Sequence, residues 1–398
     1  MIKEETLLKA KILTSGVIFS SEALKYAKKY GAKGQNLVYN APLCFEKYRP
    51  QELLLKNVDG YETVVSCVSP CSKTPVLIDV KEERLVARVD NNEIDNISIE
   101  FVKEPNYYTK KILGGHYVKD YVSACGYDEL NILPWSGCAI SKGCLFCGSN
   151  TIADMNLIKG LNAFSISKNN AWEDCKGDYL ENLKQAIAIA TESECYMEHM
   201  HVIIISGDLS DDKLNYQTEI YAEIAHTIKP YIKDKASEGI VAVLMPPEDK
   251  KLLHKLYDSG VDKVVFNIEV ANELLFNKYC PGKRNIGYKH IINSLYSSVE
   301  IFGKGNVWTN FVLGLEPINE LLKFNESLSE AGIVSSANVL HIDKGNRLDC
   351  TVPTYDAVIE YFYELSQILL RYNQTPFYCS KALRTSLSNE AFEGRIML

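Results

Sequence analysis

Beyond about residue 126, short apolar runs alternate with longer amphipathic stretches along the chain. The apolar runs predict strands at residues 130–133, 201–206, 240–245, 263–270, 307–313 and 336–342. The amphipathic stretches predict helices at residues 179–191, 215–231, 250–257, 285–301, 319–331 and 355–372. Such alternation is typical of βα units that build a parallel sheet. Six strands are enough for a partial α/β barrel, which carries its chemistry at the carboxyl ends of the strands.

The first 125 residues follow a different pattern. Helical periodicity over residues 5–30 gives way to short β-like runs at 62–67, 74–79, 84–89 and 97–102, separated by proline, Asn-Asn and charged clusters. This pattern is typical of a small antiparallel α+β unit. We therefore expect an N-terminal α+β extension over residues 1–125, a barrel core over 126–345, and a C-terminal helix and tail over 346–398 that cover the barrel mouth.

Composition narrows the class of protein. The 398 residues are 46% hydrophobic and 24% charged, as in soluble globular proteins, and the net charge of −8 disfavours a general nucleic-acid binder. The first residues lack an apolar core followed by a cleavage site, and no apolar run approaches the roughly 20 residues that span a bilayer. We expect a cytoplasmic protein with no membrane segment, in which the 12 cysteines are thiols, buried small side chains and metal ligands.

Three of these cysteines form one short loop. Cys138, Cys144 and Cys147 follow the predicted strand at 130–133 with the spacing Cys-x5-Cys-x2-Cys. Three converging thiolates suit a soft metal centre, either zinc or an iron–sulfur cluster, and leave a fourth ligand position open. A closed zinc site would need further ligands. The candidates His199, His201, Cys175 and Cys195 lack zinc-finger spacing.

The loop and its place after the first barrel strand resemble the radical S-adenosylmethionine (radical SAM) superfamily, which usually carries Cys-x3-Cys-x2-Cys there. The resemblance implies an α/β fold with a partial (β/α)6 barrel, a [4Fe–4S] cluster held by Cys138, Cys144 and Cys147, and S-adenosylmethionine on the fourth iron. The first gap here is two residues longer than usual. A similar gap occurs in the radical enzymes that build the pyridinol cofactor of iron-only hydrogenase.

The resemblance also assigns S-adenosylmethionine contacts, in the expected order along the chain. They are Phe146 against adenine, Ser206, Gly207 and Asp208 for the ammonium group, Asn267 and Glu269 for the ribose, Asn310, Gly314 and Glu316 near adenine, and His341 on the last strand. Structural alternatives stand beside them: a helix N-cap for Asp208, an exposed strand face for Asn267 and Glu269, a turn for Gly314 and Glu316, and a rim histidine for His341. Lys283 and Arg284 either hold the S-adenosylmethionine carboxylate or lie in a solvated loop.

Two further features lie outside the barrel core. Cys67 and Cys71 have the usual family spacing but precede the barrel, so we interpret them as a structural or accessory thiol pair. Tyr378 and Cys379 are candidate hydrogen donors, if the tail returns over the barrel mouth; the alternative is a buried tail.

The resemblance implies a radical SAM enzyme. Reductive cleavage of S-adenosylmethionine would give a 5′-deoxyadenosyl radical that abstracts hydrogen from a small-molecule substrate, with reduced flavodoxin or ferredoxin as the electron donor. The alternatives are a non-catalytic iron–sulfur or zinc protein with a structural or electron-transfer role, and a radical SAM enzyme that modifies a peptide or tRNA. The substrate, the reaction subtype and the oligomeric state stay open.

Overall fold

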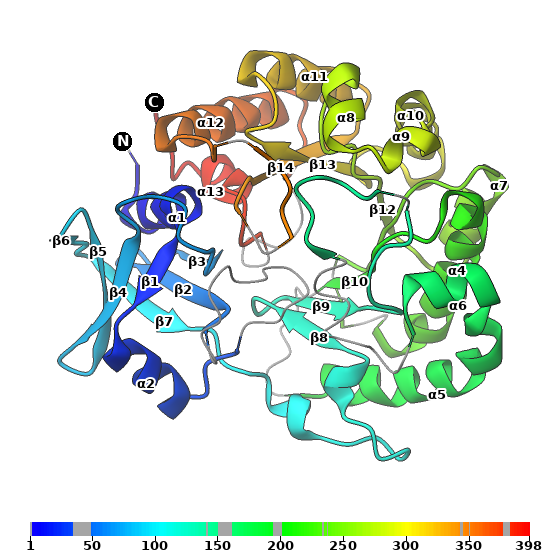
Figure 1. The fold of residues 1–398 in the computed structure, drawn as a ribbon, viewed down its shortest axis with the longest axis horizontal. Helices are drawn as coiled ribbons and strands as arrows, with labels where there is room; N and C mark the ends of the chain where they lie inside the picture. Colours follow the sequence, from blue (N-terminus) through cyan, green and yellow to red (C-terminus); the bar gives the residue numbers. More distant parts are fainter. Residues whose placement is uncertain are drawn as a thin grey trace.

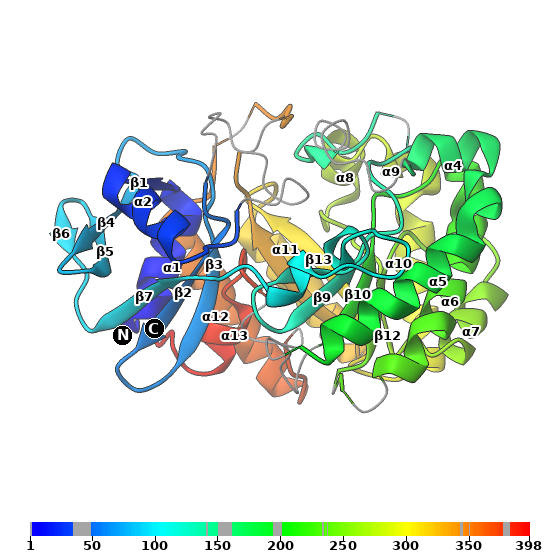
Figure 2. The same ribbon diagram turned by 90° about the horizontal axis from the view of Figure 1, so that it is seen from below.

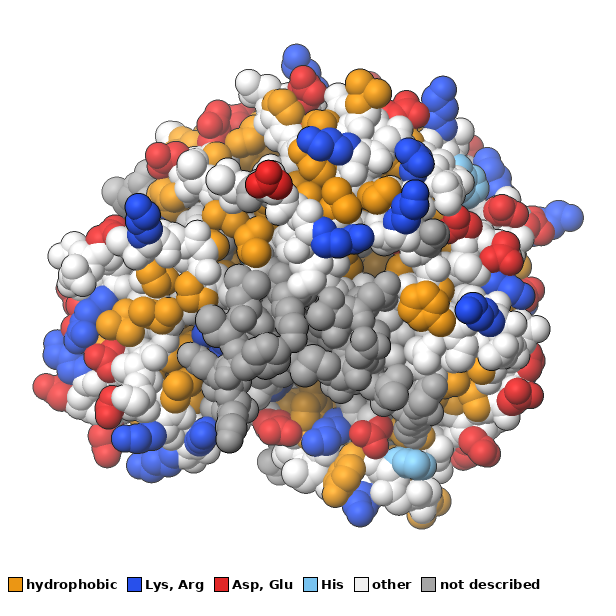
Figure 3. Space-filling model, viewed as in Figure 1, with side chains coloured by type: hydrophobic (Ala, Val, Ile, Leu, Met, Phe, Trp, Pro, Cys, Tyr) orange, Lys and Arg blue, Asp and Glu red, His pale blue; other side chains and the backbone are white. Residues whose placement is uncertain are grey.

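The computed structural model describes residues 2–34, 49–140, 142–149, 161–193, 201–232, 235–236, 238–342, 345–349, 351–376 and 383–398. The protein is a mixed α/β structure in which a curled central sheet carries helices on its outer side (Figure 1). Acidic and basic side chains are interspersed over the face seen in Figure 3. In the part of the chain described, no helix is long and apolar enough to cross a membrane.

The central sheet has seven strands, in the order β14-β13-β12-β11-β10-β9-β8. Six of them run parallel in chain order: β9 (Glu129–Ile132), β10 (His201–Ile205), β11 (Ile240–Val243), β12 (Lys263–Val265), β13 (Val307–Leu313) and β14 (Val334–Val339). Each of these six overlaps a strand that the apolar runs predict, and β12 is the most shortened. The short strand β8 (Ser123–Cys125), which no pattern predicts, pairs antiparallel with β9.

Amphipathic helices cover this sheet. They are α4 (Ala163–Asn169), α5 (Ala171–Thr191), α6 (Leu214–Ile232), α7 (Lys251–Asp258), α8 (Glu273–Tyr279), α9 (Lys283–Ile286), α10 (Tyr288–Phe302) and α11 (Ile318–Glu330). In α6, Ile220, Ile224 and Ile228 recur one turn apart and are buried, as a helix face on a sheet requires. The single helix predicted at 285–301 is divided into α9 and α10, because Gly287 (φ 98°) adopts a backbone conformation that favours glycine.

The N-terminal part contains α1 (Glu4–Ser15), α2 (Ser21–Lys29), a sheet of β1 (Val17–Phe19), β4 (Val76–Lys81), β5 (Arg84–Val89) and β6 (Asn92–Glu93), and a sheet in the order β3 (Glu62–Ser66), β2 (Glu52–Asn57) and β7 (Ile97–Phe101). Its strands pair antiparallel, except for β1 and β4, which pair parallel. The helical periodicity over residues 5–30 is interrupted at Gly16 (φ 77°), where β1 begins to pair with β4. The domain boundaries at residues 125 and 345 stay predictions.

The two ends of the chain meet (Figure 2). Ile2 pairs with Ile396, and the Lys3 N–H donates to the Arg395 carbonyl at 3.0 Å. Helix α12 (Tyr355–Arg371) packs against α11 and α1, and the short α13 (Ser388–Phe392) packs against α12. One continuous cluster of buried apolar side chains runs through the N-terminal part, the central sheet and the C-terminal helices. The central sheet and its extensions therefore share a core.

Candidate active site

The cysteine loop leaves the carboxyl end of β9 and lies against the end of β10. The fully buried Trp135 donates its indole N–H to the Gly207 carbonyl at 2.6 Å. The Ser206 hydroxyl donates to the Trp135 carbonyl at 2.8 Å. These bonds join the start of the cysteine loop to the residues that follow β10, so the two strand ends position one another.

Gly207 determines how closely the loop approaches. A Cβ atom on this residue would lie 2.2 Å from the Gly137 carbonyl oxygen and 2.7 Å from the Cys138 Cβ. The Ala139 N–H also donates to the Asp208 carbonyl at 2.8 Å. The structure therefore gives Gly207 a steric role, that of making room for Cys138 beside β10.

The second half of the loop is held from two other segments. The Leu145 N–H donates to the Tyr279 carbonyl at 2.8 Å, and the Gly282 N–H donates to the Gly143 carbonyl at 3.3 Å. Arg347 donates its guanidinium to the carbonyls of Lys142 (2.7 Å) and Cys144 (3.1 Å). These contacts hold the backbone around Cys144 and leave its thiol to other partners.

The thiols themselves lie close enough to affect one another. Burial raises the pKa of the Cys138 thiol, and Asp208, Cys144 and Cys147 raise it further. Within the described ranges, no three His, Cys, Asp or Glu side chains converge as ligands of one metal ion. The raised pKa favours the protonated thiol before metal binds. Metal binding then releases the proton, because thiolates are the ligands. By donor type, three thiols on one loop fit an iron–sulfur cluster.

A fourth cysteine joins this group, and the sequence analysis missed it. The Cys280 thiol is hydrogen-bonded to Cys144, which together with burial holds the pKa of Cys144 well above its ordinary value. Cys280 is buried, at the end of α8 in a Cys-Pro-Gly turn. Cys280 lies too far from the loop along the chain for their spacing to indicate a shared site. The Cys-Pro-Gly turn is the one local feature of the sequence that could have drawn attention to it.

The zinc ligands considered from the sequence are not gathered here. His201 is the first residue of β10, at the end of the sheet opposite the cysteine loop, with its Nε2 3.3 Å from a Glu129 carboxylate oxygen. Cys175 lies on α5 and donates its thiol to the Ala171 carbonyl at 3.1 Å. His199 and Cys195 lie outside the described residues.

Asp208 is fixed within the site by neighbouring elements. Its Oδ1 accepts from the Gln217 amide at 3.0 Å and from the Met245 N–H at 2.9 Å. Burial raises the pKa of the Asp208 carboxyl, and the Lys283 ammonium opposes that rise. The Asp208 side chain therefore links the ends of β10 and β11 and does not cap a helix, which was the alternative considered from the sequence.

Lys283 is the buried cation of the site. Its Nζ donates to the Glu269 carboxylate and to the Asn267 carbonyl, both at 2.7 Å. Burial lowers the pKa of this ammonium group, but Glu269, Cys144 and Asp208 more than offset the effect and the pKa is raised. Lys283 therefore stays charged, whereas the adjacent Arg284 is exposed.

The residues predicted to contact the ribose, which follow β12, are hydrogen-bonded within the protein and do not form a purely exposed strand face. The Asn267 side-chain oxygen accepts from the Asn310 N–H at 3.1 Å. Glu269 adopts φ 67°, and its N–H donates to the Asn310 carbonyl at 3.0 Å. Asn267, Glu269 and Asn310 thus form one hydrogen-bonded group beside Lys283.

The residues predicted near adenine and on the last strand have structural partners. The Glu316 carboxylate accepts from the Ala271 and Asn272 N–H groups at 2.7 and 2.9 Å, and burial raises the pKa of this carboxyl. Gly314 has φ 116°, and an added Cβ would lie 3.0 Å from Pro353. The His341 Nδ1 lies 3.0 Å from the Val339 carbonyl.

The remaining predicted residues divide between the core, the N-terminal part and the undescribed tail. Phe146 is half-buried and packs against the core. Cys67 is buried in the N-terminal part, and the Cys71 thiol donates to the Thr14 carbonyl at 3.5 Å. Tyr378 and Cys379, the candidate hydrogen donors, lie outside the described residues.

Comparison with known proteins finds a curated relative but no matching protein-family model. The chain is 26% identical over 196 residues to the enzyme bacteriochlorophyllide c C-7(1)-hydroxylase of Chlorobaculum limnaeum, a stretch that covers 47% of this chain and 47% of the relative. The match therefore spans about half the length of that relative.

Solved structures of similar shape include two enzymes. A radical SAM methyltransferase from Sphaerobacter thermophilus aligns with a TM-score of 0.41 and 12% identity, over 78% of this chain and 79% of that chain. The FeFe-hydrogenase maturase HydG from Carboxydothermus hydrogenoformans aligns with a TM-score of 0.39 and 15% identity, over 64% of this chain and 54% of that chain.

Proposed function

We propose that this chain is a radical SAM enzyme. The observation that carries the proposal is the place of Cys138, Cys144 and Cys147, on one loop after the first parallel strand, at the edge of the sheet where Asp208 and Lys283 also lie. Parallel α/β sheets bind their ligands at this carboxyl edge. The similarity to a curated hydroxylase supports an enzyme rather than a structural metal protein.

Different residues of the chain would bind the cluster and the two charged groups of S-adenosylmethionine. Cys138, Cys144 and Cys147 would hold a [4Fe–4S] cluster, and the cluster with S-adenosylmethionine supplies reductive cleavage to a 5′-deoxyadenosyl radical that abstracts hydrogen from substrate. Asp208 would receive the ammonium group and Lys283 would face the carboxylate, each through a charge-assisted hydrogen bond.

Other residues would orient the adenosyl group. They are Phe146, Ser206, Gly207, Asn267, Glu269, Asn310, Gly314, Glu316 and His341. Tyr378 and Cys379 stay the candidate hydrogen donors. A small-molecule substrate is favoured, because the curated relative is named for a modified chlorophyllide. Reduced flavodoxin or ferredoxin would supply the electron, in a cytoplasmic setting.

Anaerobic reconstitution tests the proposal. Wild type should bind about four irons per chain, show a cluster spectrum that changes when S-adenosylmethionine is added, and release 5′-deoxyadenosine on reduction. Cys144→Ser should lose all three properties. Cys175→Ser, which removes a thiol on α5 outside the loop, should keep them. A cluster that ignores S-adenosylmethionine in the wild type would contradict the proposal.

The contact between Cys280 and Cys144 favours one second candidate, a closed centre with four cysteine ligands and no catalytic role. Cys280→Ala separates the two functions. If the site is open, as we propose, the variant keeps its iron and its 5′-deoxyadenosine release. If the site is closed by Cys280, the variant loses iron, and the wild type forms no 5′-deoxyadenosine.

A further inference from the structure

The cysteine loop is aligned with the turn that follows α8. The residues that flank Cys144 on the loop are hydrogen-bonded through their backbones to the residues that flank Cys280 on the turn. These bonds run from the Leu145 N–H to the Tyr279 carbonyl at 2.8 Å and from the Gly282 N–H to the Gly143 carbonyl at 3.3 Å. The backbone therefore places Cys144 and Cys280 opposite each other.

The helices on either side fix the position of Cys280. Its N–H donates to the Phe276 carbonyl at 2.8 Å within α8, and its carbonyl accepts from the Arg284 N–H at 3.1 Å in α9. Cys280 is 0% exposed, so solvent does not reach its thiol. The Cys144 thiol is hydrogen-bonded to the Cys280 thiol, in agreement with the backbone alignment. The contact between the two sulfur atoms therefore belongs to the fold around the loop.

Metal binding decides which of the two sulfur atoms donates. A thiol has one S–H group, and a cysteine that binds a metal is a thiolate without it. The Lys283 ammonium lies near both sulfur atoms and favours the thiolate form of Cys144, because opposite charges attract. Once Cys144 is a ligand, its sulfur can only accept. The hydrogen bond then persists only with Cys280 as the donor.

We propose that the Cys280 thiol donates a hydrogen bond to the sulfur of the cluster ligand Cys144 and thereby raises the reduction potential of the cluster. Reduction adds one negative charge, and a hydrogen-bond donor aimed at a ligand sulfur stabilises that charge. Cys280 is then a residue that tunes the centre and does not bind iron. The inference rests on the proposed function, in which Cys144 is a cluster ligand.

Redox titration of the reconstituted full chain, without S-adenosylmethionine and followed by electron paramagnetic resonance, tests the inference. Cys280→Ala removes the donor and should favour the oxidised cluster at least threefold, a shift to lower potential of about 28 mV for a one-electron couple. Cys280→Ser keeps a donor in its hydroxyl group and should stay closer to wild type. Both variants should keep their iron, because Cys280 is not a ligand.

The matched control is Cys67→Ala, which removes another fully buried thiol, in the N-terminal part. Its cluster should have the wild-type potential, since no cluster ligand loses a donor.

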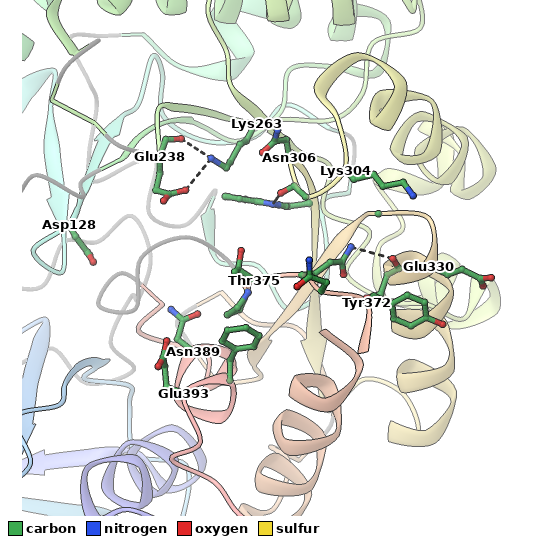
Figure 4. Close-up of a pocket in the computed structure, with 18 residues that line it drawn as sticks. Asp128, Glu238, Lys263, Lys304, Asn306, Glu330, Tyr372, Thr375, Asn389 and Glu393 are labelled. Carbon is green, nitrogen blue, oxygen red and sulfur yellow. Dashed lines mark hydrogen bonds and ion pairs between the residues drawn. The ribbon is translucent and has the colours of Figure 1, made fainter. Parts of the chain in front are cut away.

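A second control lies at the opposite end of the central sheet. There Glu238 and Lys263 line a cavity of about 920 Å³, and the Lys263 ammonium donates to the Glu238 carboxylate at 3.1 Å. Figure 4 shows the two side chains pointing toward each other. The seven residues of β13 separate the two ends of the sheet by roughly 20 Å. Glu238→Gln should therefore also leave the potential unchanged.

The outcomes separate this inference from the proposed function. The inference alone is overturned if wild type releases 5′-deoxyadenosine but Cys280→Ala has the wild-type potential or a higher one, or if Cys280→Ser shifts as far as Cys280→Ala. Loss of iron from Cys280→Ala also overturns it, because Cys280 would then be a ligand. A wild-type cluster that ignores S-adenosylmethionine contradicts the proposed function, while a lower potential in Cys280→Ala would still support the hydrogen bond. A wild type that binds no iron overturns both.

Discussion

Gly207 and Gly177 differ in the space that an added Cβ atom would find. At Gly207 an added Cβ would lie 2.2 Å from the Gly137 carbonyl oxygen, a backbone atom that cannot rotate away. At Gly177, exposed within α5, nothing lies within 4 Å of the added atom. The same substitution therefore has opposite consequences at the two positions.

We expect Gly207→Ala to push the cysteine loop away from β10. The variant should lose about 1–3 kcal/mol of unfolding free energy, as overpacked sites do, and should incorporate less iron on reconstitution than wild type. Urea unfolding and iron analysis measure the two effects. Gly177→Ala should instead gain up to about 1 kcal/mol, since alanine favours a helix interior, and should keep its iron. Equal iron contents in the two variants would show that Gly207 does not position the loop.

At this scale the sequence reveals local motifs, misses Cys280 and leaves the role of Lys283 undecided. Cys138, Cys144 and Cys147 are recognisable because their spacing is short and follows a strand. Cys280 and Lys283 belong to a segment that reaches the same group through α8 and α9. Since α9 has a single turn, periodicity cannot tell which of its two neighbouring cations is buried.

Strand β12 shows that an apolar run does not always predict where a strand ends. The apolar run predicts a strand over residues 263–270, but β12 ends at Val265. Beyond that point side chains interrupt the backbone pairing with β13: the Asn267 side-chain oxygen accepts from the Asn310 N–H, and the Thr309 hydroxyl accepts from the Ile268 N–H at 3.1 Å. Backbone bonds flank them, from the Phe266 N–H to the Trp308 carbonyl and from the Glu269 N–H to the Asn310 carbonyl. Ile268 and Val270 are buried all the same, so burial alone cannot reveal the change.

Asn267→Ala should destabilise this junction. The substitution removes the acceptor for the Asn310 N–H, and an unsatisfied buried donor costs about 1–3 kcal/mol. Asn310→Ala is the matched control, because its hydrogen bonds to Asn267 and Glu269 use backbone atoms and should persist, with a change within about 0.5 kcal/mol. Urea unfolding of the two variants tests the difference. If both variants lose the same stability, the Asn267 side chain is not what supports the strand end.

Across the whole molecule, buried ion pairs join the N-terminal part to the C-terminal segment. Lys9 and Glu390 form a 2.7 Å pair with both side chains fully buried. Glu52 in β2 pairs with Lys33 and with Arg384, each at 2.6 Å, in equally buried surroundings. The partners lie more than 300 residues apart for Lys9 with Glu390 and for Glu52 with Arg384, so no local pattern could predict them. The α+β character of the N-terminal part was predictable, but its attachment to the other end of the chain was not.

The Glu52 cluster makes stability depend on pH. Burial raises the pKa of the Glu52 carboxyl, but Lys33 and Arg384 outweigh burial and the pKa lies below its ordinary value of 4.5. The folded state then binds fewer protons than the unfolded state, so the stabilisation is complete above about pH 4.5 and is lost as the pH falls through the lowered folded-state pKa. Glu52→Gln removes the carboxylate that two buried cations share and should cost about 3–5 kcal/mol at neutral pH.

The difference between wild type and Glu52→Gln should therefore shrink on the acid side. Urea unfolding from about pH 7 down to about pH 3 should bring the two stability curves together, because acid protonates the carboxylate that the variant lacks. Glu62→Gln is the control, since Glu62 pairs with Lys56 at the surface and its loss should cost less than about 1 kcal/mol. Curves for wild type and Glu52→Gln that stay parallel down to the lowest pH would mean that the carboxylate of Glu52 is not what ties β2 to the C-terminal segment.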